Sequence, residues 1–210
     1  MTDQTVMAFP QSLTVKYKPA RLTDFIGLEK QRKILSKLAL NPRPCAMLFL
    51  GPPGTGKTTS AYAFAREISA EAHHVGSQEC KVENLQAIVH MCQYVPMSGG
   101  FHVVIVDEAD VMSDASQKYL LSKLDSTESC PKTIWIFTCN ATERLEERFL
   151  SRCTIKLEFN SYGSGEAIAD FLARVWQAEA PNAPMPNLKK IACGNVRESL
   201  SRLETELLTV

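Results

Sequence analysis

The chain has 210 residues, of which 45% are hydrophobic, and its 23 basic residues balance its 23 acidic ones. This composition excludes a disordered or fibrous protein and leaves room for one domain plus a small second one. Because the charges balance, any contact with nucleic acid depends on a local basic patch.

Short apolar runs alternate with helical segments along the first three quarters of the chain. We predict strands at 45–50, 73–76, 101–106, 133–138 and 154–159, and helices at 57–67, 85–94, 115–124 and 143–150. This alternation predicts an α/β fold in which helices cover both faces of a parallel sheet. Beyond Tyr162 only helical periodicity remains, at 167–178 and 196–208, so we expect an α/β domain over 1–160 and a small helical domain over 161–210.

The N-terminal sequence and the cysteines indicate the cellular compartment in which the protein is expected. Residues 1–4 lack the basic start and apolar segment of a secretion signal, and the apolar runs are shorter than the ~18 residues that span a bilayer. Seven cysteines occur without a Cys-x-x-Cys pair, as is usual for reduced thiols. We expect a soluble protein without disulfides that is not secreted and is cytoplasmic, or nuclear, or within a host cell if it is viral.

Histidine and cysteine form no recognisable zinc motif. His73 and His74 would face opposite sides of a strand, and His90 with Cys92 has no second cluster to complete four ligands. We therefore expect these residues to be structural and expect no structural zinc.

Residues 51–58 carry a complete phosphate-binding motif, Gly51-Pro52-Pro53-Gly54-Thr55-Gly56-Lys57-Thr58. The motif lies between a predicted strand and a predicted helix, which is the context that it requires. Glycines let backbone N–H groups approach phosphate oxygens, and the helix N-terminus adds partial positive charge. We expect this loop and Thr59 to bind a nucleotide, with Lys57 at the β- and γ-phosphates and the Thr58 hydroxyl on Mg²⁺. The alternative is a chance Gly/Pro turn.

Two acids follow the predicted strand at 101–106. Carboxylates at the carboxyl end of a core strand lie where open α/β folds bind ligands. Asp107 can hold Mg²⁺ there, and Glu108 can deprotonate an attacking water. Paired acids after a strand also occur in solvated loops, but the phosphate loop favours the functional interpretation.

Asn140 follows the predicted strand at 133–138. If that strand neighbours the one before the acids, its amide can position water against the γ-phosphate. Asn is also favoured in turns and at helix N-caps, and local sequence alone favours that structural role.

These motifs, in this order, resemble those of an AAA+ ATPase, and specifically of a small subunit of the replication factor C type of sliding-clamp loader. Ser151-Arg152-Cys153 is similar to the Ser-Arg-Cys motif of that family, and Gly194-Asn195-Val196-Arg197-Glu198-Ser199-Leu200 to its G-D-x-R-x-A-L lid sensor. Lys16-Tyr17-Lys18-Pro19 and the segment after it resemble an opening that packs near adenine, which implies that Tyr17 and Ile26 contact the base.

The resemblance implies further roles. Asn140 corresponds to sensor 1, Arg197 to the lid residue that contacts the γ-phosphate in cis, and Arg152 to a finger inserted into the site of a neighbouring subunit. A guanidinium suits the last two tasks because it stays charged and offers a planar fork to phosphate oxygens. Without the family order, both arginines would more often be solvated charges at helix ends.

DNA contacts have weaker support. The segment 77–81 resembles the one that leads into a helix tracking the template, which implies a phosphate contact for Lys81, although a lone lysine at a helix start is usually solvated. Gln117 falls where the family carries Ala-Gln-x-Ala-Leu-Arg-Arg. Only Lys118 and Lys123 are basic in that predicted helix, so we assign no DNA or coupling role there.

The resemblance implies an ATP-dependent motor subunit that uses ATP and Mg²⁺ to open a clamp and load it onto primer–template DNA. Its partners would be the sliding clamp, other clamp-loader subunits and DNA, in an oligomer and without a membrane. Relatives continue beyond Val210 into a collar domain, so we expect either a truncated chain or a naturally collarless subunit. The alternatives are another AAA+ DNA machine, such as a branch-migration motor or helicase loader, and a non-hydrolysing ATP-binding scaffold.

Overall fold

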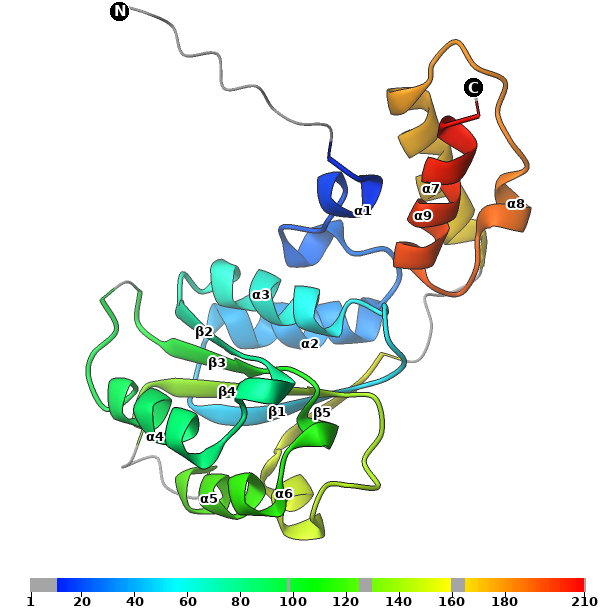
Figure 1. Ribbon diagram of the computed structural model, residues 1–210. Helices are drawn as coiled ribbons and strands as arrows, with labels where there is room; N and C mark the ends of the chain where they lie inside the picture. The colour runs from blue at the N-terminus through cyan, green and yellow to red at the C-terminus, as the bar shows by residue number, and fades with distance from the viewer. Residues whose placement is uncertain (1–10, 98, 125–129, 160–164, 210) are drawn as a thin grey trace, which may run out of the picture. The chain divides into compact units, whose positions relative to one another are not determined.

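The chain divides into two compact units by its internal contacts: residues 19–163, and residues 1–18 together with 164–210. The computed structural model describes residues 11–97, 99–124, 130–159 and 165–209 (Figure 1). Within these ranges no helix combines the length and the apolar character needed to cross a membrane.

The larger unit is built on a five-stranded sheet with the order β2-β3-β4-β1-β5. All neighbouring strands are parallel, which confirms the predicted fold class. The strands are β1 (Cys45–Leu50), β2 (Glu71–Val75), β3 (His102–Val106), β4 (Thr133–Cys139) and β5 (Ile155–Glu158). Every residue of β3 and β4 is buried, because these two inner strands are covered on both faces.

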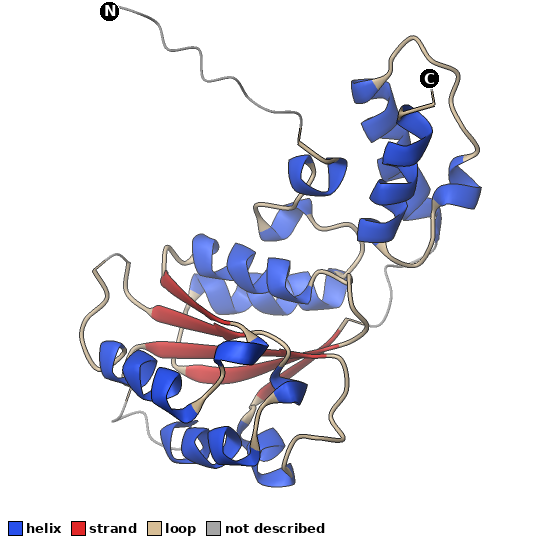
Figure 2. Cartoon of the chain, in the orientation of Figure 1, coloured by secondary structure: helices blue, strands red, loops and turns tan. Residues whose placement is uncertain are grey.

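Helices cover both faces of this sheet (Figure 2). One layer contains α2 (Glu29–Leu40) and α3 (Lys57–Glu67), and the other contains α4 (Val82–Met91), α5 (Asp114–Leu124) and α6 (Glu147–Arg152) (Figure 1). Short 3-10 turns lie at Leu22–Asp24, Ser77–Glu79 and Ala109–Val111. The second layer shares a core with the sheet, in which Leu85, Leu120 and Phe149 pack with strand residues such as Val104 and Phe137.

Three helices differ from the predictions: α2 was not predicted, α4 runs over Val82–Met91 where a helix at 85–94 was predicted, and α6 begins later than predicted. The sequence analysis did not identify α2, because only Leu35 and Leu38 of its twelve residues are buried and its start is rich in charged residues. The helix predicted from Glu143 begins at Glu147, since the segment before it forms a turn in which the Leu145 N–H donates to the Thr142 carbonyl.

The smaller unit is helical and contains α1 (Leu13–Lys16), α7 (Gly165–Glu179), α8 (Leu188–Ile191) and α9 (Val196–Leu207). Its buried apolar side chains come mainly from α7 and α9, where they recur at the spacing of an amphipathic helix: Ile168, Leu172, Val175, Trp176, Leu200 and Leu203. The helix α8 is too short to show periodicity in the sequence, and it lies just after the proline- and asparagine-rich segment 181–187.

The described residues 11–18 pack with this helical unit, whereas the sequence analysis placed them in the α/β domain. The Leu13 N–H donates to the Glu204 carboxylate at 3.2 Å, and Lys16 forms an ion pair with Glu179 at 2.8 Å. The Tyr17 hydroxyl donates to Glu179 at 2.5 Å, and burial together with this carboxylate raises the pKa of Tyr17 to about 12. These contacts span more than 160 positions, so local sequence could not reveal them. The predicted boundary near Ser161 lies outside the described residues.

Candidate nucleotide-binding site

The phosphate loop occupies the carboxyl end of β1 and requires glycine at two positions. At Gly51, with φ +154°, an added Cβ would lie 2.6 Å from the Phe159 carbonyl oxygen, which no side chain tolerates. At Gly56, with φ 81°, the backbone turns through the left-handed region directly before α3 begins. The Gly51 N–H donates to the Cys139 carbonyl at 3.2 Å, which ties the loop to the end of β4.

Lys57 lies in the first turn of α3 and is 8% exposed. Its ammonium donates to the Gly51 carbonyl at 2.6 Å, to the Pro52 carbonyl at 2.9 Å and to Asn140 Oδ1 at 3.0 Å. The Thr55 hydroxyl donates to the same Pro52 carbonyl at 2.8 Å. These internal hydrogen bonds hold the loop in place, and its lysine points to Asn140, the residue that follows β4.

Asp107 follows β3, and two hydroxyls converge on it. Thr58 Oγ1 donates to Asp107 Oδ1 at 2.7 Å, and Thr138 Oγ1 donates to the same oxygen. Hydroxyl and carboxylate oxygens are the ligands that Mg²⁺ prefers, so this donor set fits the cation expected at Thr58 and Asp107. His74 Nε2 lies 3.9 Å from Asp107 Oδ2, on the other side of the carboxylate.

Glu108 adopts a left-handed backbone conformation, with φ 53° and ψ 51°. For a residue with a side chain this conformation costs about 1–2 kcal/mol, and such strain concentrates at functional sites. The Glu108 N–H donates to Thr138 Oγ1 at 3.2 Å, which fixes the turn, while the residue itself is exposed. The turn thus presents a carboxylate at the carboxyl edge of the sheet.

The pairing of β3 with β4 and of β4 with β1 brings together Lys57, Thr58, Asp107, Glu108 and Asn140 at one edge of the sheet. The expected role of Asn140 depended on β3 and β4 being neighbours, and they are. Thr138, which bridges Asp107 and Glu108, was not predicted from the sequence. The available signal was a polar residue in an apolar strand, two positions before Asn140 and so on the same side of the strand.

Gln117 is a second residue that the sequence analysis left without a role. Its fully buried amide on α5 donates to the Arg144 carbonyl at 3.0 Å and accepts from the Glu146 N–H at 2.8 Å. These partners lie between Asn140 and α6, so Gln117 fixes the segment that joins the end of β4 to the helix carrying Arg152.

The remaining predicted residues lie on other elements. Arg152 ends α6, where its guanidinium donates to the Arg148 carbonyl at 2.9 Å. Lys81 is the exposed N-cap residue of α4, and Ile26 is half-buried just before α2. Tyr17 belongs to the helical unit, so its expected contact with adenine stays a prediction.

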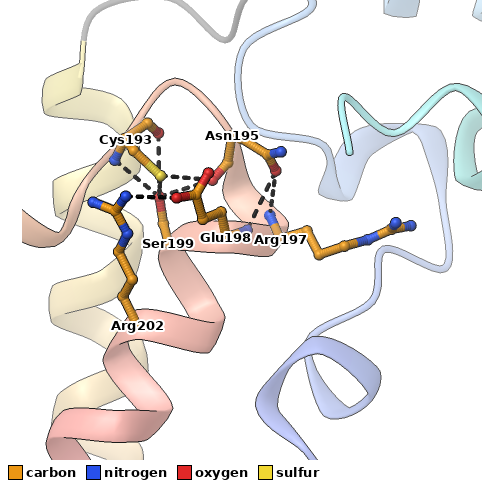
Figure 3. Close-up of polar contacts among 6 residues, drawn as sticks. All are labelled: Cys193, Asn195, Arg197, Glu198, Ser199 and Arg202. Carbon is orange, nitrogen blue, oxygen red and sulfur yellow. Dashed lines mark hydrogen bonds and ion pairs between the residues drawn. The ribbon is translucent and has the colours of Figure 1, made fainter. Parts of the chain in front are cut away.

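Arg197 lies in the first turn of α9, and Figure 3 shows its side chain extending away from the contacts that begin this helix. Asn195 is the N-cap residue, and its Oδ1 accepts from the N–H groups of Arg197 at 2.9 Å and Glu198 at 3.3 Å. Ser199 Oγ donates to the Cys193 carbonyl at 3.1 Å, which secures the preceding turn. The Asn at the second position of the lid motif therefore has a local structural function, and the exposed arginine is held at the helix start.

The AAA family, described as "ATPase family associated with various cellular activities", matches residues 47–161, which include the phosphate loop, both acids and Asn140. The chain belongs to the AAA family of ATPases. Membership in this family implies nucleotide binding at the phosphate loop.

Curated relatives of this AAA chain include replication factor C subunits, which confirms the resemblance seen in the motifs. Subunit 3 of Blastobotrys adeninivorans is 30% identical over 201 residues, covering 90% of this chain and 58% of that protein. The small subunit of Methanosarcina mazei is 28% identical over 202 residues, with 90% and 58% covered. The chain thus spans somewhat more than half the length of these relatives.

Solved structures with the same fold include the Holliday junction branch migration motor RuvB of Thermotoga maritima. That structure has a TM-score of 0.75 and 21% sequence identity, and the match covers 92% of this chain and 66% of that chain. At this level of identity the similarity establishes the AAA fold alone.

Proposed function

We propose that this chain is an ATP-hydrolysing motor subunit of a DNA polymerase sliding-clamp loader. The observation that carries the proposal is the convergence of five polar residues on the carboxyl ends of β1, β3 and β4, in a chain whose similarity to replication factor C subunits extends over 90% of its length. The rival branch-migration function has support only at the level of the fold.

Each site residue has a separate role in ATP hydrolysis. Lys57 can exchange its carbonyl and amide acceptors for the terminal phosphate oxygens of ATP. Thr58 and Asp107 would hold Mg²⁺, which supplies positive charge to the phosphates when it is bound. Glu108 accepts a proton from the attacking water, and Asn140 orients that water. Thr138 positions both acids through its single hydroxyl.

Full activity requires neighbouring subunits in this proposal. Arg152 ends α6 and serves the site of the next subunit, where an arginine supplied in trans is worth ~10³–10⁵ in rate. Arg197 serves the γ-phosphate of its own chain. An isolated chain should therefore be a poor ATPase, and its turnover should rise with protein concentration or with partner subunits.

The sliding clamp and DNA are the other proposed partners. Four large apolar side chains are exposed within one short segment at the end of α4: Met91, Tyr94, Val95 and Met97. Exposed apolar side chains gathered in this way typically mark a protein interface, and in a clamp-loader subunit we assign this one to the clamp. Lys81, at the start of the same helix, is the proposed phosphate contact, which acts through repeated copies in the oligomer because the net charge of the chain is zero.

The test is steady-state ATP hydrolysis by the chain with its partner subunits, with and without primed DNA and the cognate sliding clamp. Stimulation by the clamp and primed DNA together supports clamp loading, whereas stimulation by a four-way junction alone would support branch migration. Glu108→Gln should retain ATP binding and stop turnover. Retention of the normal turnover rate in that variant would exclude Glu108 as the base, and absence of turnover in every wild-type assembly would favour the scaffold.

A further inference from the structure

One group of metal-ligating side chains lies outside the nucleotide site. Among the described residues, His73, Cys92 and His102 place their ligand atoms within 4.8 Å of one another. Cys92 and His102 are buried and His73 is half-buried. The cluster joins three elements, since His73 lies on the edge strand β2, His102 starts β3, and Cys92 follows the last residue of α4 (Figure 1).

The strand register produces this convergence. Glu71 lies opposite His102 in the parallel pair of β2 and β3, and His73 follows Glu71 by two positions and so shares its side of the strand. His74 faces the other way, with its ring stacked on Tyr62 of α3. The sequence expectation that the two adjacent histidines diverge is thus correct, but His73 finds its partners on β3 and after α4.

The distances suit a tetrahedral ion. His73 Nε2 and His102 Nδ1 are 3.0 Å apart. With Zn–N near 2.0–2.1 Å and Zn–S near 2.3 Å, ligand atoms of a tetrahedral zinc lie about 3.3–3.6 Å from one another. The largest separation in the cluster exceeds this by no more than about 1.2 Å, which small side-chain rotations can close.

Groups next to the cluster also orient His102 for binding a metal and supply a further ligand. His102 Nε2 lies 3.0 Å from the Tyr94 carbonyl, which only accepts, so this nitrogen carries the proton and leaves Nδ1 with a lone pair toward the cluster. Such a hydrogen bond from the far ring nitrogen is the usual support of a metal-bound histidine. Glu71 Oε2 lies 4.0 Å from His102 Nδ1 and offers a fourth ligand.

We propose that His73, Cys92, His102 and Glu71 form a structural site for a borderline-soft divalent ion, zinc in particular. Two imidazoles and a thiolate select such an ion over Mg²⁺, which prefers oxygen ligands only. The ion would join the edge strand to the end of α4. It would also fix the apolar segment that follows, whose Tyr94 carbonyl and Met97 N–H already bind His102 and Glu71.

Cobalt titration of the chelator-stripped full chain tests this site, in buffer with millimolar Mg²⁺ so that the nucleotide site cannot account for the signal. A thiolate-to-cobalt charge-transfer band should appear at one equivalent per chain, and zinc should abolish it by displacement. The band should be lost in Cys92→Ser but persist in Cys45→Ser. His73→Gln should weaken zinc binding by more than the ~10–100-fold that loss of an outer-shell partner costs, and His90→Gln, on the exposed side of α4, should not.

The wild-type spectrum decides the proposal even if a buried variant folds poorly. Absence of a thiolate band from the folded wild-type chain at saturating cobalt would overturn it. An unchanged band in folded Cys92→Ser would overturn it as well. An increase in the thermal midpoint on adding zinc, present in the wild type and in His90→Gln but absent in His73→Gln, would support it.

Discussion

Replacing Gln117 by alanine should destabilise the α/β unit by about 3 kcal/mol. The amide makes two well-formed hydrogen bonds to the backbone, with the Arg144 carbonyl and the Glu146 N–H, and each is worth about 1 kcal/mol. The remainder comes from the buried methylene that is lost and from the imperfect hydration of the two abandoned backbone groups. In a unit of this size, 3 kcal/mol corresponds to a decrease of about 6–12 °C in the melting temperature.

Thermal unfolding followed by circular dichroism measures this effect, and Lys118→Ala is the matched control. The adjacent lysine side chain is 66% exposed and lies 3.9 Å from Glu146, so its loss should cost no more than about 0.5 kcal/mol. A decrease of less than about 1 kcal/mol in Gln117→Ala, or an equal loss in both variants, would refute the role of this bridge.

Three other predictions concern the site and the helical unit. Lys57→Ala should weaken ATP binding about 10–100-fold in calorimetry, because a charge-assisted contact worth about 1.5–3 kcal/mol is removed; unchanged affinity would contradict the assignment. Thr138→Val should lower the ATP turnover rate strongly, since the hydroxyl holds Asp107 and Glu108. It should lower the melting temperature only slightly, because the shape of the side chain is kept. The pKa of Tyr17 is raised from 10.0 to about 12, so its contribution to stability should be complete below pH 10 and disappear as the pH rises toward 12. Urea unfolding across this range should show a larger loss in the wild type than in Tyr17→Phe, because buried cysteines such as Cys45 also have raised pKa values and lower the stability of both proteins there.

The sequence alone predicted those parts of the fold and the site that depend on residues close together in the chain. The phosphate loop and the strand before it could be predicted because glycine, lysine and threonine at fixed spacing follow an apolar run. β1 was predicted with its observed bounds, and β3 and β4 to within one residue, because their apolar residues are continuous. The same applies to Asp107 and Glu108, which directly follow such a strand.

The remaining features depend on contacts between residues that are far apart in the sequence. The sequence could not show that β3 and β4 are adjacent, on which the contact of Asn140 with Lys57 depends. Gln117 binds residues 27 and 29 positions away, so its function was visible only after folding. His102 approaches His73 through the register of β2 and β3, which no spacing in the sequence encodes.

The left-handed backbone at Glu108 has an evolutionary consequence. Glycine adopts this conformation without penalty and asparagine with little, so either residue would make the fold more stable there while removing the carboxylate. Random mutation and selection for stability alone would thus tend to erase the glutamate, and only selection for turnover retains it. In an assembly with several related subunits, a copy relieved of hydrolysis should lose this residue early, and its variants should gain thermal stability as they do so.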